Sequence, residues 1–464
     1  MIGGKDRWWR RLLARVEERL GPWWRRLLAR LEERLGPWWR RLLARLARWG
    51  QGLAPRWRRL LALDRGEGPW WRRRRLLAAL GALALGVAGA VVALVVSTGG
   101  GGDPFPTLEA GSRFGDPRGQ KDQSEERREG RRDRRATNLS DAQIGQAVAG
   151  LFLVGFPGET PTAAFFERLQ QREWGAILVD ANNYVDKSQM TALIAQARGV
   201  AALRGGRAPV IVAPQPGGQA SAFPDLPPAE PRAVGSEGAP AVRSTTRAAA
   251  RTMADLGVDA VLAPRADIGV VGGAAEGLAY GESTDVVTRS VRAAVAAWSA
   301  GGVAPIVGRF PGEGAASQDP ELGPATVGLS LDQLGQADLR PFAAVADRAA
   351  GVQLSNALYA AIDPVTPATL LPQVVRLARK ELGFRGPVVS ADLVATTAVG
   401  GGEVGRVAVQ ALRAGCDVLF VPGGQADQEA AYRAVVRAVR TGRVSVGRVR
   451  QALERARTLR KRRA

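Results

Sequence analysis

From Asn138 onward, short apolar runs alternate with longer stretches of mixed apolar and polar residues that are typical of helices. Most positions in these runs are apolar, as expected of strands that are buried on both faces. Eight runs follow one another: AGLFLVG from Ala149, GAILVD from Gly175, APVIVAP from Ala208, DAVLAP from Asp259, APIVGRF from Ala304, GVQLSN from Gly351, GPVVSADL from Gly386 and DVLFVPG from Asp417. Eight strand–helix units predict an α/β fold, a (β/α)8 TIM-like barrel over residues 138–464.

The main alternative to a barrel is an open, doubly wound sheet, which needs fewer strands and a glycine-rich turn after the first of them. The turn that follows the first run reads GFPGET from Gly155 and lacks the dinucleotide-binding pattern. We therefore favour the barrel, and we expect no cofactor and no metal ion.

Leu76–Val96 is a run of 21 residues with no charged side chain. A helix of about 20 apolar residues spans the hydrocarbon layer of a bilayer, so we predict a transmembrane helix in residues 76–97. Four arginines, Arg72–Arg75, adjoin its first residue, and a basic flank favours the cytoplasmic side. We therefore expect a single-pass protein of the cell membrane with a cytoplasmic N-terminus and an extracytoplasmic barrel. A cleaved signal peptide is the alternative, but this run is too long and begins too far from Met1.

Residues 1–75 contain a repeat of 15 residues. WWRRLLARVEERLGP begins at Trp8, a near copy begins at Trp23, and a decaying third copy begins at Trp38. The segment holds 22 Lys and Arg against 7 Asp and Glu, and 10 of the chain's 12 tryptophans. Each Gly-Pro pair ends one helix and begins the next. Trp and Leu share one face of each short helix, which predicts a segment that lies on a membrane and contacts anionic lipid.

Two other interpretations of the repeat remain open. The near-identical copies can reflect recent expansion of a DNA repeat that is tolerated without a specific role. Arginine with interleaved tryptophan also suits nucleic acid, but the Glu-Glu pairs and the continuous apolar face make nucleic-acid binding the less favoured alternative.

Residues 98–137 are rich in Gly, Pro and charged residues and hold few apolar ones, so we expect a flexible, charged linker. Cys416 is the only cysteine, which excludes an internal disulfide. It stands before the last apolar run, where we expect it to be a small buried apolar residue rather than a reactive thiol.

Catalytic groups in a barrel of this type lie at the C-terminal ends of the strands. At the end of the seventh run, residues 390–393 read Ser-Ala-Asp-Leu. This wording resembles the Ser-Asp-Asp-Leu of glycoside hydrolase family 3, the retaining β-glucosidases and β-N-acetylglucosaminidases, in which the first Asp attacks the sugar. The resemblance covers about residues 139–424, and it implies a barrel that acts on glycans. Ala391 occupies the position of the nucleophile.

Other segments resemble the family in backbone-shaping residues but differ in the side chains that the family uses on sugar. The loop VGRFPGEG from Val307 matches Lys-His-Phe-Pro-Gly-His-Gly, with Arg309 and Glu313 in place of the two histidines. Asp319-Pro320-Glu321 stands where the N-acetylglucosaminidase branch has Asp-Ser-His. The chain contains no histidine at all.

Four residues are candidates for contact with a sugar, because they occupy binding positions of the family: Arg309, Gln215, Asn356 and Asp319. Gln215 lies where the family has Asp-Gln-Glu-Gly-Gly-Arg, and Asn356 replaces a histidine. Arg309 can hold a carboxylate or a phosphate through two hydrogen bonds. Alternatively, it forms a salt bridge within its loop to Asp319 or Glu313.

A retaining mechanism needs two carboxyl groups about 5 Å apart, and an inverting one needs an acid and a base with water between them. Asp392, Glu321 and Glu313 are the fallback candidates. Asp392 should point away from the pocket, because adjacent residues of a strand face opposite sides unless the strand has already ended. The glutamates are expected to be solvated loop carboxylates.

The sequence therefore predicts a barrel that binds a cell-wall glycan, or serves as a scaffold there, with little or no catalysis. The competing hypothesis is an active β-N-acetylglucosaminidase or β-glucosidase that uses relocated carboxylates.

Overall fold

The computed structural model describes residues 140–203 and 207–460. The predicted amphipathic segment 1–75, the transmembrane helix 76–97 and the linker 98–137 lie outside the described residues. Among the helices of the described part, none is both long and apolar enough to cross a bilayer.

Eight parallel strands form one sheet in the order β10-β1-β2-β3-β4-β5-β7-β9. The sheet curls into a barrel, and its last seam is joined by a parallel bridge between Val389 and Val418. The eight strands fall within the eight apolar runs, which confirms the predicted barrel. Their bounds are β1 Phe152–Val154, β2 Ala176–Leu178, β3 Val210–Ala213, β4 Ala260–Val261, β5 Ala304–Phe310, β7 Gly351–Leu354, β9 Val388–Val389 and β10 Leu419–Val421.

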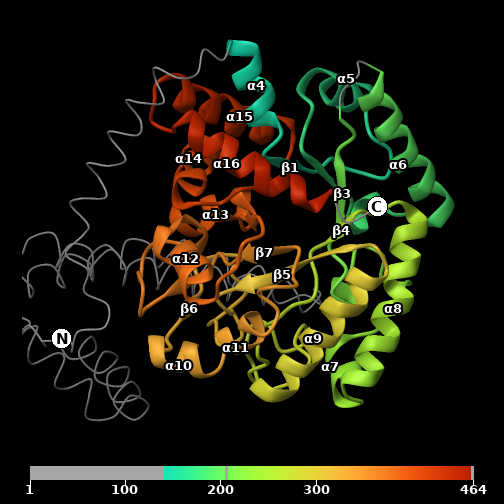
Figure 1. Ribbon diagram of the computed structural model, residues 1–464, viewed down its shortest axis with the longest axis vertical. Coiled ribbons are helices and arrows are strands. Elements are labelled where there is room, and N and C mark those ends of the chain that lie inside the picture. The colour runs from blue at the N-terminus through green and yellow to red at the C-terminus, as the bar shows by residue number, and fades with distance from the viewer. Residues whose placement is uncertain (1–139, 204–206, 461–464) are drawn as a thin grey trace, which may run out of the picture. The chain divides into compact units, whose positions relative to one another are not determined.

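Helices surround the barrel (Figure 1). The α-helices are α4 Asp141–Ala149, α5 Ala163–Arg172, α6 Lys187–Ala202, α7 Pro231–Ser236, α8 Ala239–Leu256, α9 Thr284–Ala300, α10 Leu331–Gln336, α11 Leu339–Ala343, α12 Pro372–Arg376, α13 Leu393–Gly400, α14 Val404–Ala414, α15 Gln425–Arg440 and α16 Val446–Ala456. Short turns complete the set: η1 Ala181–Asn183, η2 Gly218–Ala220, η3 Ala368–Leu370, η4 Leu377–Glu381 and η5 Arg457–Leu459. Helix α4 packs against α15 and α16, which brings the two ends of the described chain together.

Alternation along the strands creates two apolar layers. Inward-facing residues, such as Val210 and Val212 of β3, form a core inside the barrel, whereas Ile211 packs outward against the helices. Both layers lie between Val148 and Leu459. This part of the chain therefore buries a complete core of its own and can fold as a unit.

A second, two-stranded parallel sheet was not predicted. It pairs β6 Thr326–Val327 with β8 Leu358–Tyr359 beside the C-terminal end of the barrel. Because β6 follows the loop after β5, and β8 follows β7, this small sheet ties together two of the loops that carry candidate site residues.

Candidate functional site

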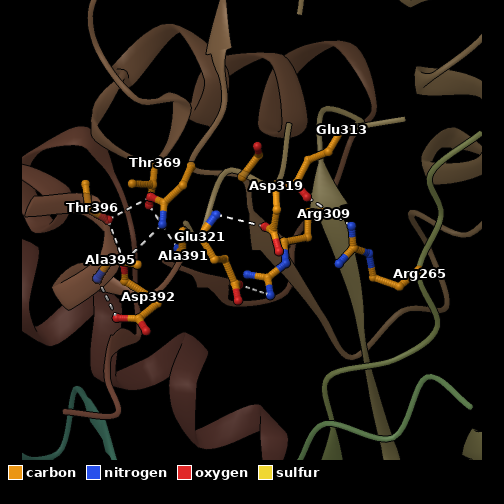
Figure 2. A network of polar contacts seen from close by, with 12 residues as sticks. Arg265, Arg309, Glu313, Asp319, Glu321, Thr369, Ala391, Asp392, Ala395 and Thr396 are labelled. Carbon is orange, nitrogen blue, oxygen red and sulfur yellow. Dashed lines mark hydrogen bonds and ion pairs between the residues drawn. The ribbon is translucent and has the colours of Figure 1, made fainter. Parts of the chain in front are cut away.

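The candidate site lies at the C-terminal ends of β4, β5, β7 and β9, where Figure 2 shows a network of charged side chains. At its centre, the Arg265 guanidinium donates to Asp267 at 2.6 Å and to Glu313 at 2.9 Å. The Asp267 carboxylate also accepts the backbone N–H of Glu313 at 2.7 Å. Arg265 thus joins the loop after β4 to the loop after β5.

Glu313 is buried, with 3% of its surface exposed, rather than solvated as expected from the sequence. Burial raises the pKa of the Glu313 carboxyl, against the opposing effect of Arg265 and Arg309. Its Oε1 has no hydrogen-bond partner among the described residues. The carboxyl group is therefore held by Arg265 and is shielded from solvent.

Arg309 forms an ion pair within its loop, as the alternative interpretation expected, but the partner is Glu321 rather than Asp319 or Glu313. The pair is partly accessible, since 14% of the Arg309 side chain and 38% of the Glu321 side chain are exposed. Arg309 Nε and Nη1 are buried and lack a partner in the described structure. Asp319 is exposed, and its carboxylate accepts the N–H of Glu321 at 2.9 Å, which fixes the turn that presents Glu321.

Asp392 does not lie on a strand. Strand β9 ends at Val389, and Asp392 caps α13 by accepting the backbone N–H groups of Val394 at 2.7 Å and Ala395 at 3.1 Å. The strand has therefore ended before Asp392, which is the stated exception to the expected outward orientation, and the period-two rule does not apply there. Burial raises the pKa of Asp392, and nearby Glu321 adds to the rise. Figure 2 shows the Asp392 and Glu321 carboxyl groups on the same side of the network.

Ala391, at the family's nucleophile position, is fully buried. Its backbone N–H donates to Thr369 Oγ1 at 3.0 Å, and its carbonyl accepts from Ser390 Oγ at 2.8 Å. The backbone is thus fixed by two hydrogen bonds, and the side chain is a methyl group that can neither attack a sugar nor donate a proton.

Gln215 and Asn356 are engaged in structural hydrogen bonds. Gln215 is fully buried and bridges its own loop, donating to the carbonyls of Phe223 and Pro227. Asn356 donates to the carbonyl of Asp392 at 3.1 Å and accepts from Thr396 at 2.7 Å. Both side chains position loops at the barrel mouth, and their polar groups are already satisfied.

Arg265 and Asp267 were not predicted as site residues. The sequence offered one indication of their role. Arg265 and Asp267 follow directly after the fourth apolar run, and two opposite charges so close to a buried strand are unusual. Their place in the site could not be predicted, because it depends on contacts with Glu313. That residue lies 46 positions beyond Asp267 in the sequence and contacts both residues only in the folded barrel.

Asp338, at the start of α11, adds a titratable group beside this network. Its carboxyl is buried and makes no capping hydrogen bond, and burial together with Asp267 raises its pKa to about 6. Because the pKa of Asp338 is higher in the folded state than in the unfolded state, the protonated carboxyl group stabilises the fold and the ionised group does not. Its contribution is therefore lost as the pH rises from about 4 to about 6.

We expect Asp338→Asn to raise the free energy of unfolding at pH 7 by about 1–3 kcal/mol and to change it little at pH 4. Urea denaturation of both proteins at the two pH values measures the difference. Asp347→Asn, at an exposed aspartate, is the control and should show no such dependence. Equal effects of Asp338→Asn at pH 4 and pH 7 would contradict the assigned pKa.

Comparison with known proteins places the barrel in a family. Residues 141–459 match the model described as glycosyl hydrolase family 3 N terminal domain. A beta-hexosaminidase of Stenotrophomonas maltophilia (strain K279a) is 30% identical over 310 residues, which are 63% of this chain and 89% of that protein. An uncharacterized secreted glycosyl hydrolase of Arthroderma benhamiae is 27% identical over 333 residues, 69% of this chain and 93% of that protein.

Solved structures agree with this placement. The family 3 β-N-acetylglucosaminidase from Paenibacillus sp. str. FPU-7 is 29% identical and superposes with a TM-score of 0.65, covering 70% of this chain; this chain spans only 63% of that structure. A β-N-acetylhexosaminidase from Beutenbergia cavernae, at 24% identity, has the same fold, with a TM-score of 0.62 and coverage of 69% of this chain and 98% of that one. The chain therefore belongs to glycoside hydrolase family 3, as the motif around Ala391 indicated.

Proposed function

We propose that this family 3 domain binds a glycan containing β-linked N-acetylhexosamine and does not cleave it. The name beta-hexosaminidase carried by the relative from Stenotrophomonas maltophilia supports the choice of sugar. The single observation that carries the proposal is the buried methyl group of Ala391 at the position of the attacking carboxylate. A retaining mechanism has no nucleophile there.

The remaining carboxylates support the same conclusion. Glu321 is paired with Arg309, Glu313 with Arg265, and Asp392 with the N-terminus of α13. Each partner stabilises the ionised form of its carboxyl group, which opposes the use of that group as a general acid. The charged groups at the C-terminal end of the barrel are thus largely paired with one another, as is typical of charges that have a structural role.

One observation favours the alternative, an active β-N-acetylglucosaminidase or β-glucosidase with relocated catalytic groups. Asp392 and Glu321 influence each other electrostatically, and burial raises the pKa of Asp392, as is usual for a general acid. In that mechanism, Asp392 protonates the leaving oxygen and Glu321 activates water.

Binding is tested by titrating the barrel, residues 138–464, with β-linked N-acetylglucosamine oligosaccharides and gluco-oligosaccharides in a calorimeter. We expect saturable binding of the N-acetylated series. Arg309→Gln should weaken it about tenfold if a charge-assisted hydrogen bond to the sugar is lost. Arg348→Gln, on the exposed surface, is the matched control. No binding of either series leaves a structural role and overturns the proposal.

We further propose that the barrel is extracytoplasmic and that the chain is anchored in the cell membrane by residues 76–97. In this arrangement residues 1–75 lie on the inner leaflet, and the linker 98–137 places the barrel near the cell-wall glycan. The uncharged run Leu76–Val96 and the basic residues before it support this topology.

A peptide of residues 1–75 should partition into vesicles with anionic lipid at least tenfold more strongly than into neutral vesicles, because it carries 22 basic residues against 7 acidic ones. Sedimentation with vesicles of both compositions, at low and high salt, measures the difference. Equal partition into the two would argue against the electrostatic part of the proposal.

A further inference from the structure

A cavity lies at the opposite end of the barrel from the candidate site, near the N-terminal ends of most of the strands. Its volume is about 310 Å³. Inward-facing apolar side chains form its inner wall, and they come from strands around the barrel: Ala176 of β2, Val210 of β3, Ile306 of β5 and Val389 of β9. Leu459 of η5 covers part of it. We call it the base cavity.

The base cavity reaches the surface beside α4, where the exposed Gln143 and Gln146 belong to its lining. Its volume falls at the small end of the range for ligand-binding cavities, roughly 300–1,000 Å³. An apolar interior with a polar opening suits a molecule with one apolar end and one polar end.

The opening is basic. Arg207, Arg457 and Arg460 all line it, together with one acidic residue, Glu173. Within the described ranges, none of the three arginines forms an ion pair. Arg460 is partly buried and donates to the carbonyl of Gly175 at 3.1 Å. Burial and the nearby Arg207 and Arg457 lower the pKa of Arg460, whereas Asp259 and Glu173 oppose part of this shift. The cationic groups repel one another, and an anion between them relieves that repulsion.

We propose that the base cavity binds an anionic amphiphile, with a short acyl chain inside the barrel and an acidic head group against Arg207, Arg457 and Arg460. The apolar wall recognises the chain, because it removes that chain from water. The guanidinium groups recognise the head group through charge-assisted hydrogen bonds. This site is separate from the barrel mouth, so its occupation does not depend on the fate of any glycan.

The test is calorimetric titration of the barrel, residues 138–464, with decanoate as the probe. Decanol supplies the chain without the charge, and acetate and inorganic phosphate supply the charge without the chain. We expect saturable binding of decanoate, at least tenfold weaker binding of decanol, and no binding of either small anion.

Variants assign the binding to this cavity. Arg207→Gln with Arg457→Gln should raise the Kd for decanoate at least tenfold, whereas Arg251→Gln, which removes an exposed charge on α8, should leave it unchanged. Ala176→Leu fills the apolar end and should abolish binding, with thermal unfolding as the check that the barrel is intact. Equal affinity for decanol and decanoate, an unchanged Kd in the double variant, or no saturable binding of decanoate would each overturn the proposal.

Discussion

Asp417→Ala is expected to lower the free energy of unfolding of the barrel by about 3–5 kcal/mol. The Asp417 side chain is fully buried and forms ion pairs with Arg379, with Arg448 at 3.0 Å and with Arg455 at 3.4 Å. Removing the carboxylate leaves three guanidinium groups close together without a counter-charge. Because two of them belong to α16, the final helix loses its main polar attachment to the barrel. Urea denaturation measures the loss.

Asp347→Ala is the matched control. Asp347 pairs with Arg348, but both side chains are more than half exposed. Exposed pairs contribute about 0–1 kcal/mol, so this variant should unfold almost as the parent does. Similar losses in the two variants would show that the buried cluster around Asp417 is no more important than a surface pair.

Arg265→Met should destabilise the barrel to a similar degree, about 3–5 kcal/mol, because it leaves two buried carboxyl groups without their cation. Asp267 is fully buried and Glu313 nearly so. Burial alone lowers the pKa of Arg265, but Asp267 and Glu313 together raise it, so the guanidinium stays charged and acts as their shared partner. Urea denaturation at pH 7 measures the effect.

Glu313→Gln tests the same ion pair from its other side. Burial already raises the pKa of Glu313, and its Oε1 has no partner in the described structure, so the neutral amide should cost less than about 1 kcal/mol at pH 7. If Glu313→Gln is as unstable as Arg265→Met, the expectation is contradicted. The ionised form of Glu313 is then essential to the stability of the network.

The barrel was predictable because its strands are buried on both faces. Burial on both faces makes each strand an apolar run in the sequence, and more polar segments separate the eight runs. The buried state of Cys416 was also predicted correctly and is confirmed. The small sheet of β6 and β8 was missed, since its two-residue strands are too short to produce a period.

The contacts of the site were less predictable, because they join residues far apart in the chain. Glu313 was a candidate partner for Arg309, but Arg265 occupies it, and Arg309 turns to Glu321 instead. No pattern within the loop reveals that competition. The orientation of Asp392 depends on where β9 ends, and strand ends are among the least certain features of a sequence-based prediction.

We propose that this family 3 barrel cannot cleave a glycosidic bond. The direct measurement is release of the aryl group from aryl β-N-acetylglucosaminide and aryl β-glucoside by residues 138–464, with the Asp392→Ala and Glu321→Ala variants assayed beside the parent. We predict release no faster than the uncatalysed rate for all three proteins. Turnover by the parent that either variant abolishes would contradict the claim and establish an active enzyme with relocated carboxylates.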